Sequence, residues 1–487
     1  MTRTKGATLR RILAALGALL LLVVGYAALD VYDVVPGVLT LANPPDAPAT
    51  PSSHTEPTAQ PSTPPVTQPR VDPAGMPLAT AGAQQPEPTA AGLAAAVGPA
   101  LADPAIAGRL GVSVRDAATG THLLDVNAQQ PLIPASNLKL LSAAAVQASF
   151  PAGATLTTKV VQGGVSGDSG QLLLVAGGDT LLASGAGDPA SVVGRAGLGD
   201  LVSATVAALR ARGVARASVA LDLSYAPGPL TASTWSPSFV PDAITGAVTT
   251  IGLAVDRAAP GRHGSANPAT SAQAAFVAAL TAAGIPASVA PQATAPAGAP
   301  VLASVTSAPI ADQLALAIVD SDDALTESLT RQAAFVKGAA PGFAATAAFV
   351  QTTLAGLGVD LTGVSLADAS GLSRQNVLPV RVLGDMLALG TDPGSRLPAM
   401  RATLQSLPVA GLSGTLSVRF EDATTRAAAG VAQAKTGTLT GVSALAGTVV
   451  TAEGRLLTFA IVSNSTGGAG GTPAARAALD RFVTVLA

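Results

Sequence analysis

The chain has 487 residues, of which 48% are hydrophobic, 3% aromatic and 11% charged, and its formal net charge is −2. This length predicts more than one domain, and the balanced charge argues against nucleic-acid binding, which needs a basic surface to neutralise phosphates. The absence of cysteine excludes thiol catalysis, disulfides and thiolate metal sites.

The N-terminal segment, residues 1–30, is typical of a membrane anchor. Four basic residues among the first eleven precede an uncharged run of 18 residues from Ile12 to Leu29. As a helix this run would span roughly 27 Å, just enough to cross a bilayer. The basic flank predicts that the rest of the chain lies outside the cytoplasm. Cleavage as a signal peptide near Gly25 and Ala27 is the alternative, and the protein would then be secreted.

A proline-rich segment follows. Between Pro44 and Pro88, 13 of 45 residues are proline, interleaved with small and polar residues. Such a stretch buries too little apolar surface to offset its ordering entropy. We therefore predict a disordered, extended linker over residues 31–89.

The globular part begins near residue 90 and mixes strands with helices. Period-2 alternation and turn residues predict strands at 110–116, 122–127, 171–176, 431–434, 444–451 and 456–462. Apolar patterns predict helices at 136–149, 307–337, 378–390, 396–407 and 473–487. Residues from about 160 to 305 alternate short elements with Pro/Gly turns. We predict an α/β (α+β) catalytic domain made of 90–160 and 305–487, interrupted by an inserted domain, 161–304.

One candidate nucleophile stands at the start of the helix 136–149. Residues 134–139 read P-A-S-N-L-K, which places Ser136 and Lys139 three apart on one helix face. A lysine partly removed from water there can take the serine proton, and this S-x-x-K arrangement is typical of penicillin-binding proteins and serine β-lactamases. Alone the motif is weak, because a capping serine followed by a solvated lysine has the same letters.

A second motif follows about 300 residues later. Lys435-Thr436-Gly437-Thr438 stands between strand-like segments. The alternative is an ordinary strand with an exposed lysine, but S-x-x-K followed by K-T-G in this context is far less frequent by chance. The three histidines, His54, His122 and His263, do not cluster. A zinc peptidase and a Ser-His-Asp hydrolase are therefore disfavoured.

From about residue 90 to the C-terminus, the chain resembles the D-alanyl-D-alanine carboxypeptidase/endopeptidase family, the class C (type 4) penicillin-binding proteins. The segments that carry the resemblance are Gly177–Asp179, Trp235–Pro241, Asp368–Ser373, Leu407–Leu416 and Ala434–Gly447. The resemblance implies a penicillin-binding transpeptidase-like core, an antiparallel sheet flanked by helices, with an inserted domain between the first and second motifs.

The resemblance also implies a set of roles. Ser136 would attack the carbonyl between two D-alanines with Lys139 as base, and backbone N–H groups of Ser136 and Thr438 would form the oxyanion hole. Ser321 would relay a proton to the leaving amine. Lys435, Thr436 and Thr438 would hold the terminal carboxylate, Gly437 would let the substrate backbone approach, and the peptide would add as a strand. The substrate would be a peptidoglycan stem peptide, β-lactams would inhibit covalently, and no metal or organic cofactor is required.

The chain departs from the family at the second motif, S-x-N. Residues 321–323 read S-D-D, so Asp323 replaces the asparagine. An ionised aspartate accepts hydrogen bonds but cannot donate one to a substrate carbonyl, and beside Lys139 it would favour the ammonium form and weaken that base. A rival S-x-N, Ser265 to Asn267, lies in a Gly/Pro-rich loop. Acidic residues at 320, 322 and 323 would also favour a helix N-terminus without any role in a site.

These observations favour a serine D-Ala-D-Ala carboxypeptidase anchored in the membrane, and they do not separate carboxypeptidase from endopeptidase activity. The alternative is a catalytically weakened homologue that binds peptidoglycan or a cell-wall protein partner, for which Asp323 is the support. A β-lactamase is a minor third reading.

Overall fold

The computed structural model describes residues 84–259, 261–466 and 471–487. The expected anchor, residues 1–30, and all but the last six residues of the expected linker, 31–89, lie outside these ranges. Among the described residues, no helix combines the length and the apolar character that crossing a bilayer requires.

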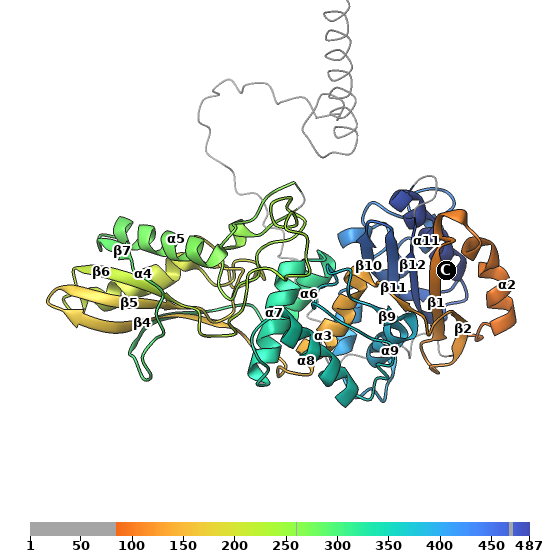
Figure 1. The fold of residues 1–487 in the computed structure, drawn as a ribbon, viewed down its shortest axis with the longest axis horizontal. Coiled ribbons are helices and arrows are strands. Elements are labelled where there is room, and N and C mark those ends of the chain that lie inside the picture. Colours follow the sequence, from red (N-terminus) through yellow and green to blue (C-terminus); the bar gives the residue numbers. More distant parts are fainter. Residues whose placement is uncertain (1–83, 260, 467–470) are drawn as a thin grey trace, which may run out of the picture. The chain divides into compact units, whose positions relative to one another are not determined.

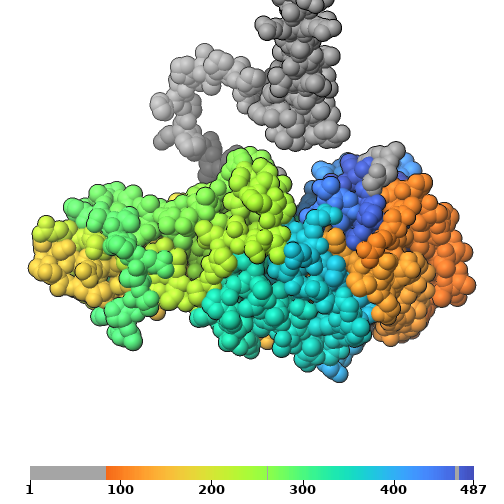
Figure 2. Space-filling view, in the orientation of Figure 1, coloured from red at the N-terminus to blue at the C-terminus, as the bar shows by residue number. Residues whose placement is uncertain are grey.

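The main sheet brings the two ends of the described chain together. It has five antiparallel strands in the order β10 (Ala432–Leu439), β11 (Val442–Val450), β12 (Leu456–Asn464), β1 (Arg109–Asp116) and β2 (His122–Val126). Because β1 pairs with β12, the N-terminal residues, orange in Figure 2, lie against the blue C-terminal ones.

Helices cover both faces of this sheet (Figure 1). Side chains alternate between the faces along each strand, so Leu445 and Phe459 join the core with α2 (Ala90–Leu101) and α11 (Gly471–Leu486). Ala444 and Val462 face the opposite core, which contains α3 (Lys139–Gln147) and α9 (Val380–Thr391). Four further helices pack around α3: α6 (Ile310–Val319), α7 (Asp323–Val336), α8 (Phe343–Gly356) and α10 (Met400–Gln405). A two-stranded sheet pairs β3 (Pro131–Leu132) with β9 (Leu378–Pro379). Short 3-10 helices are η2 (Pro104–Ile106), η3 (Ala135–Leu138), η4 (Ala254–Asp256), η5 (Gly414–Leu416) and η6 (Arg426–Ala428).

A second five-stranded sheet is formed by the part of the sequence that separates α3 from α6. Its order is β7 (Ala287–Val289), β6 (Arg216–Asp222), β5 (Ser169–Val175), β4 (Thr157–Ser166) and β8 (Val301–Thr306). The helices α4 (Leu198–Arg210) and α5 (Pro268–Ala282) share an apolar core with it (Figure 1). Its first strand along the chain, β4, begins four residues before the expected range 161–304, and its last, β8, ends two residues after it. We call residues 157–306 the inserted region.

The inserted region touches the catalytic part through two polar contacts, one buried and one partly buried. The indole N–H of Trp235 donates to Asp368 Oδ2 at 2.8 Å. The Arg257 guanidinium lies 2.6 Å from Asp322 Oδ2, just before α7. Both partners adjoin residues of the site described below, so the inserted region supports its framework.

The mixed α/β fold confirms the expected class, but some expected helices were wrong in detail. The expected helix 307–337 is two helices, because Ser321 adopts a left-handed backbone with φ of 56° and Asp322 caps the new start by accepting from Leu325 N at 2.8 Å. The expected helix 136–149 begins as η3, and only residues 400–405 of 396–407 are α-helical.

Candidate active site

The turn that carries Ser136 is clamped on two sides. The preceding Ala135 has a left-handed backbone, with φ of 48°, a strained conformation that persists only where the surroundings impose it. A Cβ on Gly371 would lie 2.0 Å from Ala135 O, and a Cβ on Gly437 would lie 2.7 Å from Pro134 O. Glycines at these two positions therefore let a loop and strand β10 press against the turn. This packing is the structural reason for Gly437, whose expected place was beside the substrate.

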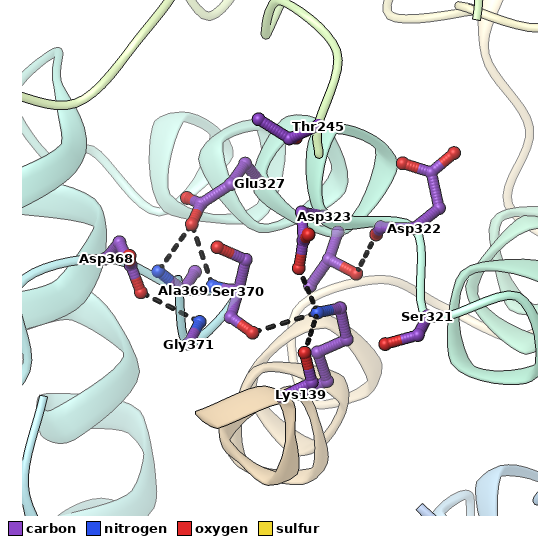
Figure 3. Close-up of polar contacts among 12 residues, drawn as sticks. Lys139, Thr245, Ser321, Asp322, Asp323, Glu327, Asp368, Ala369, Ser370 and Gly371 are labelled. Carbon is purple, nitrogen blue, oxygen red and sulfur yellow. Dashed lines mark hydrogen bonds and ion pairs between the residues drawn. The ribbon is translucent and has the colours of Figure 1, made fainter. Parts of the chain in front are cut away.

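Lys139 lies beneath Ser136 with no exposed surface. Its Nζ donates to Ser136 Oγ at 3.0 Å and to the Ser370 carbonyl at 2.9 Å. A third bond goes to Asp323 Oδ1, and Figure 3 shows the ammonium between α7 and the loop 368–371. All three N–H groups of an ammonium are thereby used.

Asp323, the residue that departs from the family pattern, lies directly against Lys139. It is the first residue of α7 and is only 8% exposed. Burial raises the pKa of the Asp323 carboxyl, against the opposing effect of Lys139. The rival motif lies elsewhere: the Asn267 side chain caps α5 by accepting from Thr270 N in the inserted region.

The K-T-G residues, 435–437, lie on β10, across from Ser136, Lys139 and Asp323. Lys435 is also fully buried, and its Nζ lies 2.8 Å from Ser321 Oγ and 3.0 Å from Thr436 O. Burial, followed by the nearby positive charge of Lys139, lowers the pKa of Lys435 well below its usual range. The Thr436 hydroxyl donates to Thr415 Oγ1 at 2.8 Å.

A cleft of about 600 Å³ opens over these groups. Ser136, Ser321, Thr436 and Thr438 all line it, while the opposite wall comes from residues 418–422 and from α11. The structure thus brings the expected residues together: four line the cleft, Lys139, Asp323 and Lys435 lie buried beneath it, and Gly437 packs behind the nucleophile turn.

Two buried carboxyl groups, Glu327 and Asp368, support Lys139 through the loop 368–371, and the sequence alone indicated no role for Glu327. Glu327 Oε1 accepts the backbone N–H groups of Ala369 and Ser370 at 2.8 and 2.7 Å, and Asp368 Oδ1 accepts Gly371 N at 2.9 Å (Figure 3). These carboxyl groups fix the loop whose Ser370 carbonyl accepts a hydrogen bond from Lys139. The available signals were the segment Asp368–Ser373, D-A-S-G-L-S, and the spacing of four between residues 323 and 327.

Burial also changes the protonation of Glu327. It raises the pKa of Glu327 to about 8, and the charge of Asp368 adds to the effect. Two carboxyl groups so close together in a dry interior cannot both ionise cheaply. Near neutral pH the pair Glu327 and Asp368 therefore keeps one proton.

Comparison with known proteins agrees with this geometry. A model of the D-Ala-D-Ala carboxypeptidase 3 (S13) family matches residues 93–257 and 243–486. The Carboxypeptidase DacB of Mycolicibacterium smegmatis is 36% identical over 407 residues, which cover 82% of this chain and 85% of that protein. A D-alanyl-D-alanine carboxypeptidase of an Actinomadura species is 32% identical over 457 residues, covering 80% and 83%.

The fold has a solved counterpart too. Penicillin binding protein 4 of Haemophilus influenzae superposes with a TM-score of 0.66 over 79% of this chain and 97% of that one, at 19% identity. The chain belongs to the D-Ala-D-Ala carboxypeptidase 3 family, a family of serine peptidases. The family and enzyme class expected from the sequence are confirmed.

Proposed function

We propose that this chain removes the terminal D-alanine from peptidoglycan stem peptides through an acyl-enzyme on Ser136. The observation that carries the proposal is the 3.0 Å contact between Ser136 Oγ and the buried Lys139 Nζ at the floor of the cleft. The names of the relatives support the substrate class.

The cleft residues would divide the work of binding. Thr436 and Thr438 would hold the terminal carboxylate above the two buried lysines, and the peptide would lie along β10 as an added strand. Backbone N–H groups of Ser136 and Thr438 would receive the oxyanion. Ser321, in contact with Lys435, would return a proton to the leaving amine.

The same step would also cut cross-linked peptides. The cleft of about 600 Å³ reaches from Ser136 and Thr436 to Arg476 and Asp480 of α11, and this width supports room for residues attached to the leaving amine. We therefore propose endopeptidase activity as a second activity of this site. Incubation with cross-linked stem-peptide dimers, followed by chromatography, should yield monomers, and recovery of intact dimers would limit the enzyme to carboxypeptidase activity.

Labelling with penicillin tests the main proposal. Penicillin binding protein 4 of Haemophilus influenzae has been solved in complex with a β-lactam, which supports β-lactams as ligands of this site. The full chain incubated with penicillin should gain one adduct, which peptide mass spectrometry places on Ser136. Ser136→Ala should lose it, while Ser149→Ala, on a serine just after α3 whose hydroxyl donates to the Ala145 carbonyl, should keep it. An adduct on another residue would refute the assignment.

One observation favours the alternative of a weakened homologue that binds peptidoglycan or a cell-wall protein partner. Asp323 contacts Lys139 directly, so the proposed base has a carboxyl group beside it where the family pattern has an amide. If wild type gains no adduct yet sediments with purified peptidoglycan, the binding function replaces the enzymatic one.

The proposed location is the cell membrane, with the catalytic part extracytoplasmic, or secreted if the N-terminus is cleaved. Its support is the uncharged run from Ile12 to Leu29 behind a basic cluster, which lies outside the described residues. Protease treatment of intact cells should degrade the catalytic part if it is exposed.

A further inference from the structure

Lys139 Nζ makes three hydrogen-bond contacts, as many as an ammonium has protons. As an ammonium, Lys139 has three protons, and all three point at acceptors: Asp323 Oδ1, Ser136 Oγ and the Ser370 carbonyl. No lone pair of Nζ is left facing Ser136. Lys139 can therefore accept the serine proton only while it gives one of its own away.

Only one of the three acceptors is able to keep that proton. The Ser370 carbonyl is a very weak base, and Ser136 is the group that is losing its proton. The remaining acceptor is the Asp323 carboxylate. We propose that Asp323 is the terminal proton acceptor of a Ser136–Lys139–Asp323 relay, and hence a catalytic residue of the reaction proposed above, on which this inference rests.

The surroundings of Asp323 suit this role. A general base works best when its pKa lies near the working pH, and burial moves the carboxyl in that direction. Charged groups face it from three sides: Lys139 from α3, Lys435 from β10, and the adjacent Asp322, which Arg257 of the inserted region neutralises. The site therefore contains one carboxylate against two buried lysines.

Charge balance gives the relay a catalytic advantage. Before reaction, the negative Asp323 compensates Lys139. Once Asp323 has taken the proton it is neutral, while Lys139 remains an ammonium. The buried site thus becomes more positive at the moment when negative charge develops on the substrate carbonyl oxygen, which stabilises the transition state.

The steps balance without any further reactant. As Ser136 Oγ bonds to the carbonyl carbon, its proton passes to Lys139 Nζ, and a Lys139 proton passes to Asp323 Oδ1. The C=O electron pair moves onto oxygen. When the tetrahedral intermediate collapses, the C–N bond breaks, and the proton held by Asp323 returns by way of Lys139 and Ser321 to the leaving amine. Water then attacks the acyl carbon and passes a proton through Lys139 to Asp323. As this second intermediate collapses, the bond between the acyl carbon and Ser136 Oγ breaks, and Ser136 takes that proton back.

Variants at residue 323 separate a proton acceptor from a mere anchor for Lys139. An amide can still accept the Lys139 hydrogen bond but cannot take a proton, so Asp323→Asn should acylate with penicillin about a hundredfold more slowly than wild type. Asp323→Ala should lose as much. Asp323 also borders a second cavity, of about 590 Å³, through which sodium formate can reach the vacated space. Formate should then restore Asp323→Ala about tenfold.

The controls use the same measurement, the second-order acylation rate of the full chain. Formate should leave Asp323→Asn unchanged, because the amide fills the space. Asp320→Asn, which removes a half-exposed carboxylate just before α7, should acylate like wild type. An Asp323→Asn rate equal to or above wild type, or an Asp323→Ala rate that formate does not raise, would overturn the relay. Failure of wild type to acylate would instead reject the proposed function.

Discussion

Glu327→Gln is expected to remove a pH-dependent loss of stability from the folded chain. Glu327 is 1% exposed, and burial together with Asp368 raises its pKa from 4.5 to about 8. Because the folded-state pKa lies above the unfolded value, the folded chain holds the proton more tightly. This contribution to stability is fully present below about pH 4.5 and is lost as the pH rises to about 8.

The size of the effect follows from that interval. Each unit between the unfolded pKa of 4.5 and the folded pKa of about 8 corresponds to about 1.4 kcal/mol for one proton. The full loss of unfolding free energy therefore reaches about 5 kcal/mol. That is a large share of the 5–15 kcal/mol by which domains are typically stable, in round terms ~0.1 kcal/mol per residue. Glutamine keeps an oxygen for the N–H groups of Ala369 and Ser370 but stays neutral at every pH.

Urea unfolding of the full chain between pH 5 and pH 9 measures this difference. The free energy of unfolding of wild type should fall across that range relative to Glu327→Gln, so that the variant gains most above pH 8. Glu453→Gln, in the exposed turn between β11 and β12, removes the same charge and should follow wild type within about 0.5 kcal/mol. Parallel curves for wild type and Glu327→Gln would refute the reasoning.

Three further substitutions test the framework of the site. Gly371→Ala should cost ~2–3 kcal/mol and slow penicillin acylation, because φ is 92° and a Cβ would lie 2.0 Å from Ala135 O; an unchanged melting temperature would contradict this packing. Gly356→Ala should instead stabilise by up to ~1 kcal/mol, since it ends α8 in open space, and thermal unfolding decides the sign. Trp235→Phe removes the N–H donated to Asp368 and should cost about 1.5–3 kcal/mol in urea unfolding, whereas a neutral result would mean that water replaces the indole.

Local patterns were enough to place the reactive motifs on their elements. The apolar segments around Lys435 predicted strands, and β10, β11 and β12 follow one another as hairpin-connected neighbours. Ser136 and Lys139 do lie one above the other, although in a 3-10 turn that leads into α3. Spacing of three and period-2 alternation survive such changes because both depend on the backbone path over only a few residues.

The parts that sequence could not supply depend on the backbone and on distant partners. Glu327 binds two peptide N–H groups, which every non-proline residue carries, so no side-chain letter marks them. The helix break at Ser321 requires a left-handed residue that serine adopts without any propensity signal. Asp323 was expected to weaken Lys139 and to offer the substrate no donor; its depth of burial, which decides whether it can receive a proton, is a property of the packed fold.

The spacing within α7 explains how these groups act on one lysine. Asp323 and Glu327 are four residues apart, so they share a helix face. Asp323 contacts Lys139 directly, while Glu327 holds the loop whose Ser370 carbonyl binds the same ammonium. The start of that helix is set by Asp322, which Arg257 of the inserted region holds at 2.6 Å. A shift of α7 along its axis would therefore move both supports of Lys139 together, and the inserted region restrains that shift from outside the catalytic part.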